Sequence, residues 1–529
     1  MVVSPRRLPA TGPHPTALGS SSALRVRAWP AVLAAMLAVG GILAEPSAVA
    51  PLSNGSTASA ATPRPDPGLR ARSARPPAAS HEIYGYLPYW QVDARTARRI
   101  DYRTVTTIAF FAVPVQANGT LNRASAGYRA YVSRAARAIT NAAHAHGVRV
   151  VPTFQLFDRG QLTRMRQFLH SRAAQTRFIR QAISLMIHRR ADGANVDFEP
   201  VPRSLAAPFA AFIGRFGRAI HARFPRSQLV VATGALASVR LIERLAPVVD
   251  RFFIMAYDYR WSGSRIPGAV APLTGGGLNV SATVGRYLRH APASKLILGV
   301  PLYGYSWPVA RTSRGIRVRA EPSRWGGVRG VTYAAAMRFL KRHPRVQLHT
   351  EGGRGAWFRY WDAPNRTMRE VHFEDAGLAR AKFNHAIERG LAGVGLWALG
   401  SDRGTSAVRS ALLTTYVRPT RRVALHAWVG RPRLVRGVIE APAAIAVANR
   451  GNRAERGLIY WRVYSPRGRV VAGGSRVVAM GVGGSARLSV QLQLGWASKR
   501  AAGIYRLVTS FRGGHAIWWA PSQRFRQPY

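Results

Sequence analysis

Three polar side chains alternate along one short apolar segment, which reads Asp192-Gly-Ala-Asn-Val-Asp-Phe-Glu199. If the segment is a β-strand, Asn195, Asp197 and Glu199 point to one side and the residues between them point to the other. Two neighbouring carboxyl groups raise the pKa of one of them, so one acid can keep its proton near neutral pH. Such a proton can be donated to a leaving oxygen, which is general acid chemistry.

An ordinary alternative is that Asp197 and Glu199 are strand-end acids, neutralised by solvent or by arginines. The whole sequence holds only 22 acidic residues. Three acids within this one short segment therefore favour a functional cluster over a chance one.

The pattern of apolar segments predicts the elements that position these acids. From His81 onward, short apolar segments alternate with longer amphipathic ones, which is typical of a parallel sheet with helical connections. Eight short segments fit a closed (β/α)8 TIM barrel better than an open sheet. In such a barrel the carboxyl ends of the strands hold the active site, so we expect Glu199 at the open mouth. The predicted strands are Ile83–Leu87, Thr107–Ala112, Arg149–Phe154, Ala194–Phe198, Leu229–Thr233, Phe252–Ala256, Leu296–Pro301 and Val394–Ala398.

Two of the helical connections are well marked. Apolar residues recur at helical spacing over Tyr128–His146 and Asp375–Arg389, and Gly147 or Gly390 follows as a C-terminal cap. The segment at about 306–372 is too long for an ordinary connection, so we predict a small α+β insertion between the seventh and eighth strands.

The chain is expected to divide into four parts. Residues 1–50 have basic residues, an apolar run and Ala48-Val-Ala50, the pattern of a signal peptide with its cleavage site. Residues 51–80 are rich in Pro, Ala and Ser and predict a linker. The barrel takes residues 81–416, and short alternating runs in 417–529 predict an all-β, sandwich-like accessory domain.

These boundaries predict a protein that is secreted or associated with the cell wall. The alternative is a membrane anchor formed by an uncleaved N-terminal segment, although its apolar run is shorter than the roughly 20 residues that a spanning helix needs. We expect a monomer.

The net charge of +55 is unusual for a globular chain of 529 residues. It could attract anionic cell-wall polymers or nucleic acid, or it could reflect codon bias. No nucleic-acid module is recognisable, so we expect no nucleic-acid partner. The sequence contains no cysteine, which excludes disulfides and thiolate metal sites. We expect no cofactor and no metal.

The acidic segment resembles the active-site signature of family 18 glycoside hydrolases, the chitinase-like barrels. It is most similar to the branch of bacterial peptidoglycan and spore-wall hydrolases, which carries Asn at the middle position. The third strand lacks the Ser-x-Gly-Gly of typical chitinases, which lowers the case for chitin. Supporting motifs follow in chain order as Tyr84-Gly-Tyr-Leu-Pro-Tyr-Trp90, Met255-Ala-Tyr-Asp-Tyr259, Gly299-Val-Pro-Leu-Tyr-Gly304 and Gly395-Leu-Trp-Ala-Leu-Gly400.

The resemblance implies retaining, substrate-assisted cleavage of β-1,4 linkages in a polysaccharide that contains N-acetylglucosamine, such as peptidoglycan or a chitin-like polymer. It implies three catalytic residues. Glu199 would protonate the glycosidic oxygen, Asp197 would hold the acetamido N–H of the sugar, and Tyr257 would donate to the acetamido oxygen.

The resemblance also implies a set of substrate-binding residues. Asp192 would support Asp197 from behind, Asp258 would hydrogen-bond the sugar, and Trp397 would form an apolar floor beneath it. From the strand alternation, we expect Asn195 to donate a hydrogen bond to anionic Asp197. The alternative for Tyr257 and Trp397 is that they are ordinary core aromatics.

Two other functions remain open. A catalytically weak lectin could share the fold, although lectins of this kind commonly lose the acid that Glu199 provides. A basic cell-wall adhesin would need only the charge.

Overall fold

The computed structural model describes residues 81–527 apart from short gaps at 159–160, 314, 418–420, 450, 452–454, 482–483, 497–501 and 514–515. The expected signal peptide (1–50) and linker (51–80) lie outside the described residues.

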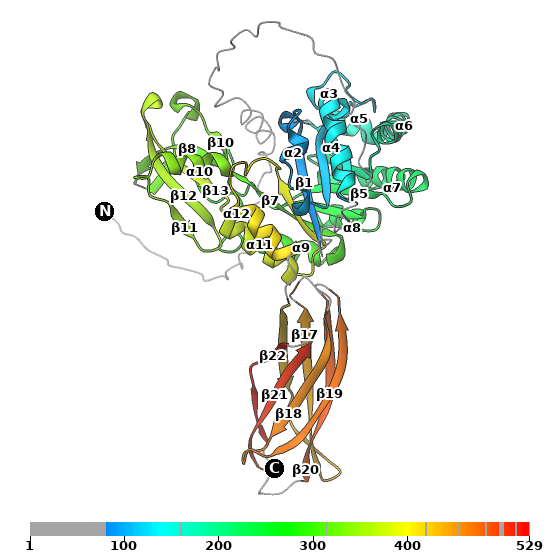
Figure 1. Ribbon diagram of the computed structural model, residues 1–529, viewed down its shortest axis with the longest axis vertical. Coiled ribbons are helices and arrows are strands. Elements are labelled where there is room, and N and C mark those ends of the chain that lie inside the picture. The colour runs from blue at the N-terminus through cyan, green and yellow to red at the C-terminus, as the bar shows by residue number, and fades with distance from the viewer. Residues whose placement is uncertain are drawn as a thin grey trace, which may run out of the picture.

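Eight parallel strands close into a barrel (Figure 1), so the predicted (β/α)8 fold is confirmed. Every predicted strand overlaps an observed one. Around the barrel the order is β1-β14-β7-β6-β5-β4-β3-β2. The strands are β1 (Glu82–Pro88), β2 (Thr107–Pro114), β3 (Arg149–Phe157), β4 (Gly193–Glu199), β5 (Gln228–Gly234), β6 (Arg251–Met255), β7 (Leu296–Pro301) and β14 (Gly393–Trp397).

Helices surround the barrel. One prediction is wrong here, because the single helix expected over Tyr128–His146 is two helices, α3 and α4. Ser133 leaves helical geometry between them, and its side chain accepts the Ala136 N–H to begin the second helix. The helices are α2 (Thr96–Arg99), α3 (Ala126–Val132), α4 (Arg134–Ala145), α5 (Thr163–His170), α6 (Arg172–Arg189), α7 (Ala206–Arg223), α8 (Val239–Leu245), α9 (Val280–Leu288), α11 (Ala376–Glu388) and α12 (Ala407–Leu412).

Packing on the outer side of β4 fixes which way its polar residues point. Val196 and Phe198 are buried against the surrounding helices. The Phe198 ring lies 5.4 Å from that of Phe168 and 5.7 Å from that of Phe212. Burying such a side chain stabilises the fold by about 1.5–3 kcal/mol. A register slip would expose these rings, so the alternate residues of β4 must face the barrel interior.

The interior of the barrel is filled mainly by aromatic rings. Tyr84 and Tyr86 of β1 pack against Phe253 of β6, and the ring centroids of Tyr86 and Phe253 are 4.7 Å apart. Near the carboxyl ends of the strands, Trp397 joins this cluster. The filled interior closes the barrel below the acids, so a ligand can approach only from the mouth.

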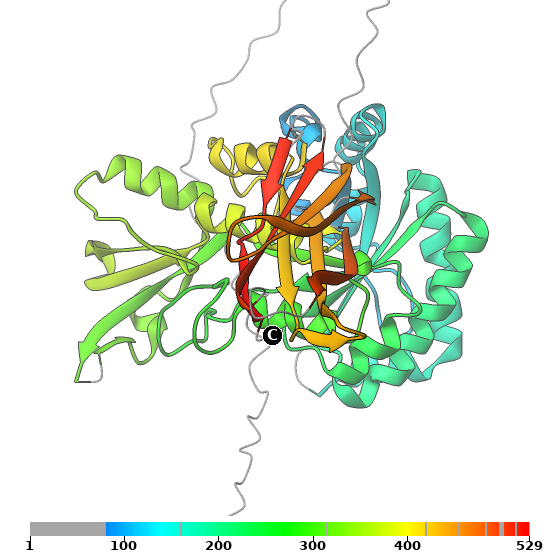
Figure 2. The same cartoon turned by 90° about the horizontal axis from the view of Figure 1, so that it is seen from below.

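The insertion forms a six-stranded sheet with one helix, and the α+β prediction is confirmed. It begins at Tyr303, slightly before the expected start, and projects to one side of the barrel (Figure 2). Its elements are β8 (Tyr303–Thr312), β9 (Gly315–Val318), β10 (Arg329–Thr332), α10 (Tyr333–Arg342), β11 (His349–Glu351), β12 (Gly355–Asp362) and β13 (Thr367–Phe373).

The C-terminal region consists of two antiparallel sheets, as expected for a sandwich-like domain. The four-stranded sheet contains β15 (Val423–Val429), β16 (Arg433–Val435), β17 (Val438–Asn449) and β20 (Ser485–Trp496). The five-stranded sheet contains β18 (Glu455–Tyr464), β19 (Val470–Met480), β21 (Gly503–Gly513), β22 (Ala516–Trp519) and β23 (Gln523–Gln527).

The C-terminal domain lies at the end of the barrel opposite the mouth. The last turn of α11, which leads into the amino end of β14, shares a cavity with Arg422, Val423 and Ala424 at the start of the domain. Figure 1 shows the domain extending away from the barrel in that direction. Glu199 ends its strand at the other end, so this domain does not shape the candidate active site.

Candidate active site

The polar residues of β4 point into the barrel, as the alternation predicted. Asn195 is fully buried and Asp197 is only 4% exposed, while Glu199 is half-buried at the end of the strand. Strand β3 pairs with this row, placing Thr153 beside Asn195 and Gln155 beside Asp197. The row therefore rises from the interior to the mouth.

Burial raises the pKa of both carboxyl groups. It raises the pKa of Asp197 to about 7, and interaction with Glu199 works against this shift. It raises the pKa of Glu199 well above its usual range, and the negative charge and hydrogen bonding of Asp197 add to that effect. Of the two, Glu199 is therefore the acid that holds a proton while Asp197 carries the charge. The two groups titrate as a pair.

Tyr257 and Asp258 follow β6 directly and stand beside this pair. Burial raises the pKa of Tyr257, and the charges of Asp258, Asp197 and Glu199 raise it further, so its hydroxyl remains a hydrogen-bond donor. Asp258 also contributes to the raised pKa of Glu199. Asp197, Glu199, Tyr257 and Asp258 therefore lie close enough together for their charges to influence one another's pKa values.

Two hydroxyl groups of the insertion hold Asp258 in place. Tyr303 donates to its Oδ1 at 2.6 Å and Tyr305 donates to the same atom at 3.0 Å. Burial raises the pKa of Asp258 to about 6, and these two hydrogen bonds oppose the shift. The start of the insertion is therefore part of the site.

Trp397 ends β14 and forms an aromatic surface next to the acids. Its ring lies edge-on to Phe111 at 4.6 Å and to Tyr86 at 5.3 Å, and it is half-buried. The remaining exposed part of the ring is available to an apolar sugar face. Trp397 therefore packs like a core aromatic residue and also lies at the site.

Comparison with known proteins agrees with this geometry. Residues 82–402, more than half of the chain, match glycosyl hydrolases family 18. The chain belongs to glycosyl hydrolase family 18. The C-terminal domain lies beyond the matched residues.

The similar proteins include a cortical fragment-lytic enzyme and a chitinase, as their names state. The cortical fragment-lytic enzyme of Bacillus subtilis (strain 168) is 33% identical over 153 residues, covering 29% of this chain and 32% of that enzyme. Endochitinase 1 of Metarhizium robertsii is 25% identical over 254 residues, covering 44% of this chain and 57% of that enzyme. The chain thus spans from about a third to somewhat over half of these relatives' lengths.

Solved structures confirm the family 18 fold. The spore cortex-lytic enzyme SleL of Bacillus cereus superposes with a TM-score of 0.51 at 20% identity, over 63% of this chain and 74% of that chain. A Group IV chitinase of Ostrinia furnacalis superposes with a TM-score of 0.54 at 17% identity, over 63% of this chain and 99% of that chain.

Asp192 does not have the position that was expected from the family 18 signature. Its Oδ2 accepts the backbone N–H of Val150 at 2.7 Å and lies 2.8 Å from Nε2 of His144, on the outside of the barrel. At about 3.3 Å per residue along the strand, Asp192 lies roughly 16 Å from Asp197. The expectation that Asp192 supports Asp197 is therefore wrong, and its carboxylate instead joins the amino ends of the strands to α4.

Asn195 also differs from its expected role. Its Nδ2 donates to the Tyr86 hydroxyl at 3.0 Å and to Oγ1 of Thr153 at 3.2 Å. Both amide hydrogens are thereby used, so the expected donation to Asp197 is absent. Burial raises the pKa of Tyr86 well above its usual range, the nearby charge of Asp197 adds to this shift, and the hydrogen bond with Asn195 opposes it.

Sequence reasoning gave no role to Gln155, Tyr86, Tyr303 and Tyr305, although Tyr86 and Tyr303 stand within the supporting motifs. Among the described residues, Nε2 of Gln155 and Oδ1 of Asp197 are buried without a hydrogen-bond partner, although the two residues are neighbours across β3 and β4. Buried polar atoms of this kind are costly unless a ligand or water satisfies them. The alternation of Thr153, Gln155 and Phe157 in β3 was the available signal.

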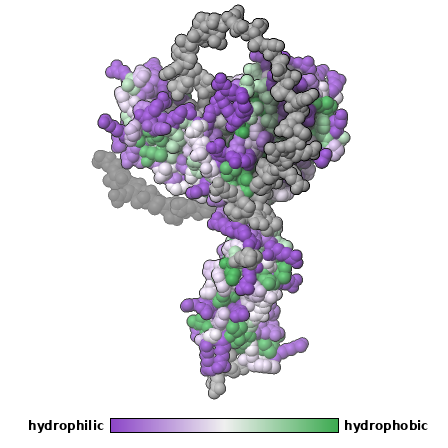
Figure 3. Space-filling model, in the orientation of Figure 1, coloured by the Kyte–Doolittle hydropathy of each residue, from purple (hydrophilic) through white to green (hydrophobic). Residues whose placement is uncertain are grey.

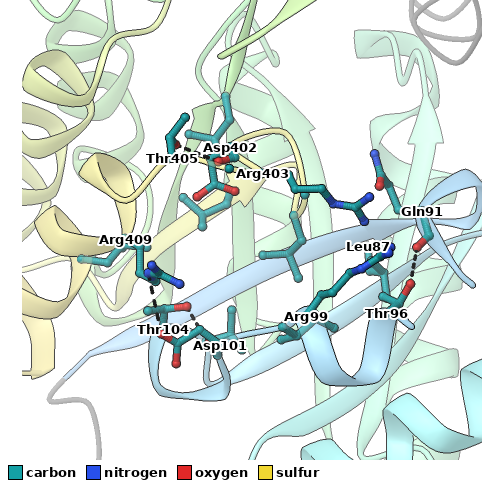
Figure 4. Close-up of a pocket in the computed structure, with 18 residues that line it drawn as sticks. Leu87, Gln91, Thr96, Arg99, Asp101, Thr104, Asp402, Arg403, Thr405 and Arg409 are labelled. Atoms are coloured by element: carbon teal, nitrogen blue, oxygen red, sulfur yellow. Dashed lines mark hydrogen bonds and ion pairs between the residues drawn. The ribbon is translucent and has the colours of Figure 1, made fainter. Parts of the chain in front are cut away.

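A second hollow, of about 300 Å³, lies beside the ends of β1 and β14 (Figure 4). Its walls include Leu87 and Leu396, which belong to the apolar cluster outside the barrel. Arg409 points toward Asp101 there, at 3.9 Å. Neither Asp197 nor Glu199 lines this hollow, so it is separate from the candidate active site.

Proposed function

We propose that the protein is a glycosidase that cleaves β-1,4 linkages in a polysaccharide containing N-acetylglucosamine, by a retaining, substrate-assisted mechanism. The observation that carries the proposal is the buried pair of Asp197 and Glu199, in which Glu199 holds the proton at the barrel mouth. Membership of family 18 supports the same chemistry.

In the first step, Glu199 gives its proton to the glycosidic oxygen as the bond from that oxygen to the anomeric carbon breaks. The acetamido carbonyl oxygen of the same sugar forms a bond to the anomeric carbon and produces an oxazolinium ion. Anionic Asp197 accepts a hydrogen bond from its N–H and offsets the positive charge. Tyr257 donates to the acetamido oxygen.

In the second step, the Glu199 carboxylate takes a proton from water as the water oxygen bonds to the anomeric carbon. The oxazolinium ring opens, and the acetamido group is restored. The configuration at the anomeric carbon is retained because it is inverted twice. Glu199 ends the cycle protonated, ready for the next substrate.

The substrate is held by the groups around this pair. Asp258, kept in place by Tyr303 and Tyr305, accepts a hydrogen bond from the sugar, and Trp397 lies beneath its apolar face. Peptidoglycan is the polymer we favour, because one relative is named a cortical fragment-lytic enzyme and because strand three lacks the typical chitinase motif.

We also propose that the protein acts outside the cell or at the wall, as a monomer. The signal-like N-terminal sequence supports the location. Among the described residues no helix is long and apolar enough to cross a membrane.

A lectin on the same fold remains the second candidate, and it differs in one measurable respect, since it would bind N-acetylglucosamine oligomers without cleaving them.

Digestion of purified peptidoglycan, chitin and a fully deacetylated glycan tests the proposal. We expect reducing ends from at least one of the two N-acetylated polymers, none from the deacetylated glycan, and β-anomers as the first product seen by NMR. Cleavage of the deacetylated glycan would contradict substrate assistance. Binding without cleavage would favour the lectin.

A further inference from the structure

The outer face of the five-stranded sheet in the C-terminal domain has an unusual composition. Its exposed arginines come from three neighbouring strands, β18, β21 and β23. Beside them, Trp519 is 66% exposed and Ile504 is 60% exposed. Figure 3 shows hydrophilic and hydrophobic residues interspersed over this domain. We call this surface the arginine face; its arginines are Arg456, Arg462, Arg506, Arg512, Arg524 and Arg526.

No acidic residue balances the arginine face. Residues 417–529 contain only two, Glu440 and Glu455. Glu455 is buried and pairs with Arg421 at 2.7 Å, and Glu440 lies on the other sheet. Within the described part of the chain, no arginine of the face forms an ion pair. Its positive charge is therefore free to interact with a ligand.

The arrangement of these arginines is costly unless an anion offsets it. Arg506 lies directly opposite Arg524 in the register of β21 and β23. Like charges directly opposite each other destabilise an antiparallel pair. A ligand with several negative charges would remove this repulsion.

Tyrosine rings hold two of the guanidinium groups in place. Arg506 lies over the ring of Tyr464 at 5.2 Å, and Arg512 lies over the ring of Tyr460 at 5.7 Å. Stacked guanidinium groups lose less freedom on binding and present a planar fork of donors that fits phosphate oxygens. The face is therefore suited to anions repeated along an extended chain.

We propose that the arginine face binds a phosphodiester-linked glycopolymer of the cell wall. The arginines bind its phosphates, and Trp519 with Ile504 packs against its sugars. The choice of a wall glycopolymer over nucleic acid rests on the proposed glycosidase function. Because the domain lies at the end of the barrel opposite the mouth, the face can hold the polymer while the active site cleaves another glycan.

Binding of the full chain to a soluble poly(ribitol phosphate) bearing N-acetylglucosamine tests this proposal. The face variant is Arg462→Gln/Arg506→Gln/Arg512→Gln. The matched control is Arg431→Gln/Arg433→Gln/Arg487→Gln, which removes the same charge from exposed positions on or beside the other sheet. A further variant, Arg524→Gln/Arg526→Gln, removes charge from the face without uncovering a tyrosine ring.

We expect the face variant to bind about tenfold more weakly, since each exposed ion contact contributes roughly twofold. Its affinity should also depend less steeply on salt. The logarithm of the affinity should fall less than about half as far in the control variant as in the face variant. Arg524→Gln/Arg526→Gln should bind about fourfold more weakly than the unaltered protein. Single-stranded DNA of matched charge should bind more weakly than the glycopolymer.

Three results would overturn the proposal: equal losses in the face and control variants, no binding by the unaltered protein at low salt, or tighter binding of DNA than of the glycopolymer. The last would indicate a nucleic-acid surface. Hydrolysis of a soluble N-acetylglucosamine oligomer by the same variants separates the two proposals. It depends on the catalytic residues and not on the arginine face, so we expect the hydrolysis rate of each variant to be unchanged.

Discussion

Asn195 donates from its Nδ2 to the Tyr86 hydroxyl at 3.0 Å, joining two strands whose residues are 109 positions apart in the sequence. Because its other amide hydrogen goes to Thr153, any effect of Asn195 on Asp197 acts through the arrangement of the barrel interior and not by direct donation. Tyr86 is fully buried beside Asp197, and burial keeps its hydroxyl protonated by raising its pKa. We therefore expect the middle residue of the signature to act as a positioning residue.

Asn195→Asp should move at least one limb of the pH profile of kcat/KM. The substitution replaces a neutral donor with a carboxyl group at a fully buried position, two residues from Asp197. A second nearby carboxylate raises one of the two pKa values, so we expect the acidic limb to move to higher pH. The profile should be measured on a soluble N-acetylglucosamine oligomer. Two limbs within error of the unaltered enzyme, in a folded variant, would show that this position does not influence the catalytic pair.

Tyr303→Phe should shift the ionisation of Asp258. The variant removes the 2.6 Å hydrogen bond that holds the pKa of Asp258 down to about 6, so that pKa should rise. If ionised Asp258 binds the sugar, kcat/KM should fall at a higher pH than in the unaltered enzyme as the solution is acidified. The control is Tyr102→Phe, which removes a hydroxyl that donates a hydrogen bond to the backbone carbonyl of Ala97, away from the site. This variant should leave the profile unchanged. Identical profiles for both variants would argue against a binding role for Asp258.

Lys382→Met should destabilise the barrel, and more so at higher pH. Lys382 Nζ lies 2.6 Å from both carboxylate oxygens of Glu374, and the two side chains are buried where the insertion rejoins the barrel. Removing one partner of a buried pair costs about 3–5 kcal/mol in the free energy of unfolding. Chemical denaturation measures this loss.

The pH dependence of that loss follows from Glu374. Burial raises its pKa to about 7, and Lys382 opposes this, so the variant should raise the pKa further. A raised pKa in the folded state favours folding below the usual pKa of a glutamate, and this contribution disappears as the pH rises through the folded value. The loss should therefore be larger at pH 8 than at pH 5. Lys382→Met/Glu374→Leu should recover most of the stability, and a pH-independent loss would contradict this explanation.

The sequence was sufficient to predict the barrel because each strand is a short apolar segment between polar ends. The structure also brings together Asp197, Glu199, Tyr257, Asp258 and Trp397, which the sequence predicted to share one site. Contacts between distant strands were not predictable. The orientation of Asn195 depends on Tyr86, and the environment of Asp258 depends on tyrosines of the insertion. Asp192 was misplaced because the signature is continuous in sequence, whereas an extended strand separates its first residue from the site.

The turnover of Glu199→Gln on a soluble N-acetylglucosamine oligomer tests the central claim most directly. The amide has the shape of the acid but cannot donate its proton, so we predict that kcat/KM falls by about 100-fold or more while the oligomer still binds. Glu321→Gln, an exposed change on the insertion, serves as the control and should keep full activity. If Glu199→Gln keeps more than about a tenth of the unaltered rate, Glu199 is not the general acid.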